Sequence, residues 1–82
     1  MEIGSIYGYK LNPTALIYRI LEIVDGPAEP IVKVRLLVGK TQYIGKIIES
    51  GFSVIENDIP ITQEQFDFYQ ITGVLPISSH TK

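Results

Sequence analysis

Apolar and polar side chains alternate along residues 31–38. The even positions of this segment are all apolar, and Lys33 and Arg35 stand between them. Alternation with a period of two predicts a strand with one buried and one solvated face. Residues 16–24 are rich in β-branched and aromatic side chains and predict a second strand. Residues 25–30 contain Asp-Gly and two prolines, so a hairpin loop is expected between the two strands.

Shorter segments around this hairpin predict further strands. One is expected within residues 3–11, closed by an Asn-Pro pair. Gly39-Lys40-Thr41 predicts a tight turn into a strand at residues 43–49. Ser50-Gly51 predicts another turn, into a strand at residues 52–56. The chain is thus expected to contain four or five short strands.

The pattern changes to that of a helix after residue 61. Thr62 is a favourable N-cap, and Gln65 three residues later completes a capping box. Gly73 is a typical residue to follow the end of a helix. We therefore predict a short helix that extends to about Ile71.

A small barrel is the fold that best accommodates four or five short strands and one helix. A chain of 82 residues allows one domain and buries only about 60–65% of its unfolded surface, so a bare sheet face is costly. We expect a mainly β fold, an SH3-like or OB-like antiparallel barrel with one short C-terminal helix, because closure removes exposed edges. The alternative is an open antiparallel sheet with the helix on one face. The domain is expected at residues 1–76, with a flexible polar tail at residues 77–82.

Composition narrows the classes of protein further. The chain is 45% hydrophobic and 20% charged, with a net charge of −2, which is too apolar for a disordered tail. The absence of cysteine excludes disulfides, thiolate catalysis and cysteine zinc sites. The first residues do not resemble a signal peptide, and no apolar run approaches the roughly 20 residues of a membrane helix. We expect a soluble, cytoplasmic protein without a membrane partner.

The sequence contains little that indicates a catalytic site. Gly39-Lys40-Thr41 resembles the end of a phosphate-binding loop, but Val34 occupies the position where that motif needs a glycine. His80 is the only histidine and lies in the polar tail, where nothing would fix its tautomer. We therefore expect no enzyme activity, no catalytic residue, no cofactor and no metal site.

The predicted helix carries two apolar stripes. Phe66 and Tyr69 share one side, whereas Phe68 and Ile71 form a second pair elsewhere on the helix. The second pair packs either within its own domain or against a partner. Residues 47–81 also hold five acidic side chains and no lysine or arginine. We predict a non-catalytic protein–protein interaction module, a subunit, adaptor or inhibitor that binds another protein or its own copy. The expected contact residues are Glu64, Asp67, Phe68 and Ile71.

Two other functions are weighed against this one. Tyr7, Tyr9, Lys33 and Arg35 could form a stacking and basic surface for single-stranded nucleic acid. A sequence pI near 5.2 argues against it, because nucleic-acid-binding domains usually have a pI above about 9. A third alternative is the binding or sequestration of a small ligand.

Overall fold

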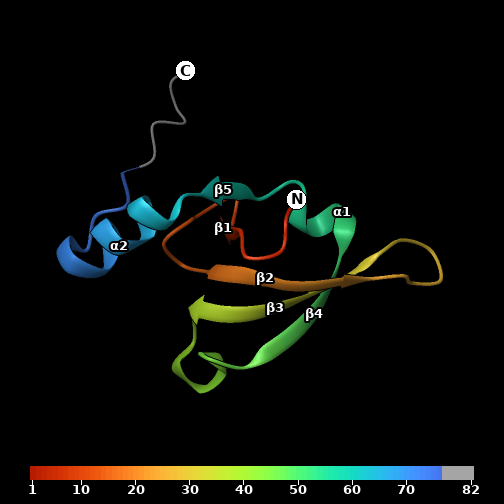
Figure 1. The fold of residues 1–82 in the computed structure, drawn as a ribbon. Helices are drawn as coiled ribbons and strands as arrows, with labels where there is room; N and C mark the ends of the chain where they lie inside the picture. The colour runs from red at the N-terminus through yellow and green to blue at the C-terminus, as the bar shows by residue number, and fades with distance from the viewer. Residues whose placement is uncertain (77–82) are drawn as a thin grey trace.

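The computed structural model describes residues 1–76 and contains one five-stranded sheet (Figure 1). The tail expected at residues 77–82, with His80, lies outside the described residues. The elements are β1 (Ile6–Gly8), β2 (Ile17–Val24), β3 (Ile31–Val38), the 3₁₀ turn η1 (Thr41–Tyr43), β4 (Ile47–Gly51), α1 (Phe52–Ile55), β5 (Ile59–Ile61) and α2 (Gln63–Thr72).

The strands follow the order β4-β3-β2-β1-β5, and every neighbouring pair is antiparallel. β4 and β5 are the two edges, and among the described residues they do not pair with each other. The mainly β class and the open antiparallel sheet with a short helix are confirmed. Closure of the sheet into a barrel, which the sequence analysis preferred, is not confirmed. The hairpin of β2 and β3 matches its prediction closely.

The segment after β3 differs from its prediction. The strand expected at residues 43–49 begins only at Ile47, because η1 occupies the start of that segment. Ser50 and Gly51 end β4 and do not form a turn. Residues 52–55 are helical, so the strand expected at residues 52–56 is wrong.

A contact distant in sequence accounts for the start of α1. The carboxylate of Glu29 accepts hydrogen bonds from the backbone N–H of Ser53 at 2.8 Å and from its hydroxyl at 3.2 Å. It thereby satisfies a backbone donor at the start of α1, one of the groups that lack an intrahelical partner at a helix N-terminus. Phe52 N–H donates to the carbonyl of Pro30 at 3.0 Å. The hairpin loop between β2 and β3 thus holds α1 in place.

The two shortest strands pair with each other. β1 covers only three of the residues expected at 3–11, because Gly4, at a φ of 95°, interrupts the extended chain before it. The sequence analysis did not predict β5, because Pro60 lies at the centre of this strand, opposite Tyr7. A proline is accepted there because β5 is an edge strand and needs no second row of hydrogen bonds.

Helix α2 forms where the sequence predicts it. The backbone N–H of Gln65 donates to Thr62 Oγ1 at 3.0 Å, and Gln65 Oε1 accepts from the N–H of Thr62 at 2.8 Å. These two bonds complete the predicted capping box. Gly73 ends the helix at a φ of 79°, a conformation that favours glycine.

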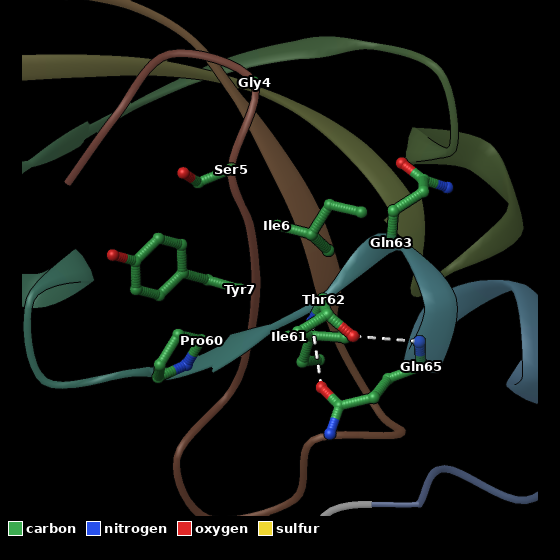
Figure 2. Close-up of a pocket in the computed structure, with 9 residues that line it drawn as sticks. All are labelled: Gly4, Ser5, Ile6, Tyr7, Pro60, Ile61, Thr62, Gln63 and Gln65. Atoms are coloured by element: carbon green, nitrogen blue, oxygen red, sulfur yellow. Dashed lines mark hydrogen bonds between the residues drawn. The ribbon is translucent and has the colours of Figure 1, made fainter.

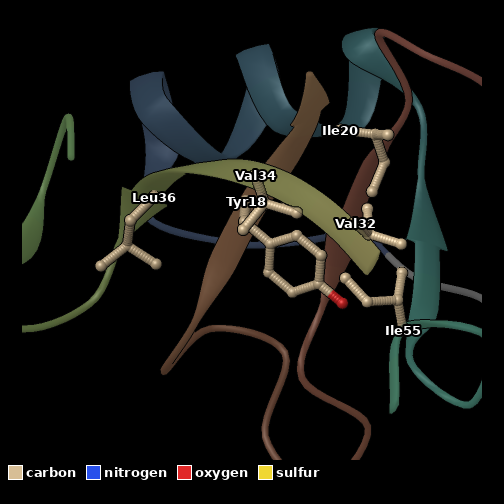
Figure 3. Close-up of a cluster of buried hydrophobic side chains, with 6 residues drawn as sticks. All are labelled: Tyr18, Ile20, Val32, Val34, Leu36 and Ile55. Atoms are coloured by element: carbon tan, nitrogen blue, oxygen red, sulfur yellow. The ribbon is translucent and has the colours of Figure 1, made fainter. Parts of the chain in front are cut away.

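Buried side chains lie on both sides of the sheet. On the side that we call the α1 face, Ile55 joins residues of β2 and β3; Figure 3 shows the cluster of Tyr18, Ile20, Val32, Val34, Leu36 and Ile55. On the opposite side, the α2 face, Phe66 packs against Ile6, Ile17 and Ile61. Neighbouring residues of a strand point to opposite faces, so β2 supplies both clusters.

We expect the Ile55→Ala substitution to lower the free energy of unfolding by about 2–5 kcal/mol, because it leaves a cavity under α1. Ile55 is 1% exposed, whereas its neighbour Val54 is 58% exposed. Urea unfolding of Val54→Ala provides the control, with an expected change within about 0.5 kcal/mol. Equal losses in the two variants would contradict the role given to Ile55.

Candidate functional site

The outward side of α2 is apolar at its centre. Phe66 is buried against the sheet and Tyr69 packs beside the same cluster. Phe68 is 47% exposed and Ile71 is 85% exposed. Within residues 1–76, the second stripe of the helix therefore remains exposed.

Acidic side chains share this side of the helix. At 100° per residue, Glu64, Asp67, Phe68 and Ile71 fall within an arc of about 100°. We call these four residues the α2 outer surface. Both acidic residues are exposed.

Hydrogen bonds connect this surface to the sheet. Gln63 Nε2 donates to Asp67 Oδ1 at 2.9 Å, while Gln63 Oε1 accepts from the guanidinium of Arg19 at 2.9 Å. Arg19 also donates to the carbonyl of Gly4 at 3.0 Å. The first turn of α2 is thus tied to β2 and to the segment before β1, which fixes the orientation of the α2 outer surface.

An open pocket of about 480 Å³ lies where β1 and β5 meet the start of α2. Figure 2 shows Ser5 and Tyr7 on one side of β1 and Ile6 on the other. The capping box occupies two of its polar side chains, Thr62 and Gln65, and Gln63 binds Arg19. Much of its polar lining therefore serves to hold α2 in place.

A second depression lies on the α1 face. It has a volume of about 220 Å³, and its walls come from β2, β3, β4 and α1. We call it the α1-face groove. Its apolar and aromatic lining consists of Tyr9, Leu16, Tyr18, Val34, Leu36, Ile48, Val54 and Ile55, and Glu49, Ser50 and Asp58 complete it.

A hydrogen bond joins two of the residues that line this groove. The Tyr18 hydroxyl donates to Asp58 Oδ2, and the backbone N–H of Lys10 donates to Oδ1 of the same carboxylate at 3.2 Å. Burial, followed by the hydrogen bond to Asp58, raises the pKa of Tyr18 well above its usual range. The Tyr7 ring stacks beside Tyr18, with centroids 6.3 Å apart and planes 12° from parallel.

The residues considered for nucleic-acid binding do not form one surface. Tyr7 packs against the cluster of the α1 face, and Tyr9 lines the groove there. Lys33 and Arg35 alternate with buried β3 residues of that face and therefore point to the α2 face. The sheet separates the two tyrosines from the two basic residues.

Other chemistry is sparse in the part of the chain that the structure describes. Residues 1–76 contain no group of three or more His, Cys, Asp or Glu side chains that could hold a metal ion. No helix within the same range is long and apolar enough to cross a membrane. Comparison with protein-family models, curated proteins and solved structures finds no match to this chain.

Sequence reasoning missed the α1-face groove. Val54 and Asp58 line it because residues 52–55 are helical, and the sequence analysis treated this segment as a strand. The available signal was the pair of neighbouring isoleucines at the start of β4, Ile47 and Ile48, which no single-faced strand would bury together.

We expect Tyr18→Phe to lower the free energy of unfolding by about 2 kcal/mol at neutral pH, because the bond to the Asp58 carboxylate is lost. The folded-state pKa of Tyr18 is raised, so this contribution is complete below the unfolded value of about 10. It decreases as the pH rises above that value. Chemical unfolding of both proteins between neutral and alkaline pH measures the difference.

Tyr9→Phe serves as the control for that comparison, since Tyr9 is 36% exposed and lines the same groove. Its stability should remain close to that of the unaltered chain. A difference between Tyr18→Phe and the unaltered chain that stays constant through the alkaline range would contradict the assignment.

Proposed function

We propose that this protein is a non-catalytic protein–protein interaction module that binds through the α2 outer surface. The supporting observation is that Phe68 and Ile71 are exposed on α2 although Phe66 already anchors the helix to the sheet. Within residues 1–76, the second apolar stripe belongs to neither of the two buried clusters. A subunit, adaptor or inhibitor of a larger protein would present such a surface.

The energy available at this surface fits a specific contact. Complete burial of a side chain the size of phenylalanine or isoleucine contributes about 1.5–3 kcal/mol. Aromatic residues at the centre of a contact often carry much of the binding energy. Glu64 and Asp67 on the same surface favour a partner that combines basic with apolar side chains, because complementary charges speed association and select partners.

Finer features of the fold and location belong to the same proposal. We propose that the sheet curls toward an SH3-like small barrel, supported by the short connection between its two edges, which consists of α1 and residues 56–58. A cytoplasmic location is supported by the lack of cysteine. Binding to its own copy is an alternative to binding an unlike partner.

Phe68→Ser and Ile71→Ser should each weaken partner capture by at least about tenfold, because each removes apolar area from the contact. Gln70→Ser provides the control, as Gln70 is exposed on the same helix but outside the α2 outer surface. Affinity capture from host lysate, with the mass of each variant measured by light scattering, compares them. Unchanged partners and unchanged mass in both apolar variants would overturn the proposal.

A further inference from the structure

Among residues 1–76, β4 is an edge strand whose outer row of backbone groups has no strand beside it. Leu36 N–H donates to the carbonyl of Lys46 at 3.1 Å, and Phe52 N–H donates to that of Pro30 at 3.0 Å. Backbone groups alternate in direction along an antiparallel strand, so the even residues of β4 bond to β3. Ile47, Glu49 and Gly51 therefore direct their N–H and C=O groups away from the sheet.

The two edges of the sheet differ in protection. At β5, Pro60 removes a backbone donor. β4 contains no proline and carries Ile47, which is 57% exposed, beside Ile48, which is partly exposed. An apolar, unprotected edge of this kind readily accepts another strand.

The α1-face groove runs along this edge. Ile48 is in register with Val34 and lies on the α1 face, where it forms part of the groove. Val54 of α1 also lines the groove and is 58% exposed. A strand added to β4 would direct every second side chain to this face, next to the groove.

β4 itself contributes one charged side chain to this edge, the acidic Glu49. Glu49 lines the α1-face groove at the edge of the sheet, and its register with Lys33 directs its side chain toward the α2 side of that edge. Lys33 makes its ion pair with Glu22, at 3.8 Å. Among residues 1–76, Glu49 itself has no ion-pair partner. A basic side chain from an added strand would meet Glu49 across the new pair.

We propose that the β4 edge and the α1-face groove bind an extended segment of another protein in which apolar and basic residues alternate. The segment adds as a sixth strand, with its apolar side chains over the groove and its basic ones beside Glu49. β3 shows this pattern on the inner side of β4, with Val32 and Val34 on the α1 face and Lys33 on the other. This site is independent of the α2 outer surface.

Two synthetic peptides test the proposal with the whole chain. One has the sequence of residues 31–38, and in the other glutamate replaces its lysine and arginine. Calorimetric titration should show tighter binding of the basic peptide by about fivefold, the effect expected of one exposed ion pair. Glu49→Lys should reverse this preference. An unchanged preference in that variant would contradict the pairing with Glu49.

A separate variant tests the backbone hydrogen bonds between β4 and the added strand. Ile47→Pro removes an outward N–H and leaves the pairing with β3 in place, so it should abolish binding of both peptides. Val54→Ser should weaken both, whereas Phe68→Ser should leave both unchanged, which separates this site from the α2 outer surface. Thermal unfolding verifies that each variant folds. If Ile47→Pro does not fold, the change of peptide preference in Glu49→Lys still decides the test.

Three results would overturn the proposal. The first is that neither peptide binds at a concentration of about 1 mM, because any remaining affinity would be too weak for recognition. The second is binding that a folded Ile47→Pro variant retains. The third is an unaltered chain that is dimeric by light scattering and becomes monomeric in Ile47→Pro, because the edge would then be occupied by a second copy.

Discussion

The structure depends on burying both faces of a very small sheet. Ile17 and Tyr18 are neighbours in β2, yet they belong to different clusters on opposite sides. A single apolar face would leave the chain with too little buried area for its size. α1 and α2 each supply one buried side chain, Ile55 and Phe66, that completes a cluster. The two short helices thus help to cover the two faces of the sheet, while its edges β4 and β5 stay open among the described residues.

Local patterns were sufficient for the elements that depend on neighbouring residues. The alternation of β3, the loop before it and the capping box at Thr62 are all visible in the sequence, and the structure contains them. The strand predicted at residues 52–56 was wrong because the start of α1 depends on Glu29, which is distant in sequence. β5 was missed because only its edge position makes Pro60 acceptable.

The candidate surfaces also differ in how far the sequence predicted them. Helical periodicity predicted that Phe68 and Ile71 lie apart from Phe66, but only the fold could show that nothing covers them within the described residues. The groove required the positions of β4, α1 and Asp58 together, and no local motif contains these. Tyr7 and Lys33 were placed on one hypothetical surface, since their separation depends on the pairing of β1 with β2 and β3.

The contact between Glu29 and Ser53 has a consequence for the wall of the groove. Glu29 lies in the exposed hairpin loop, whereas α1 forms one wall of the α1-face groove. A change in this loop that breaks the contact would remove two hydrogen bonds from the start of α1. The loop conformation and one wall of the groove are thus coupled through a single carboxylate, although Glu29 does not line the groove and two strands separate it from Ser53 along the chain.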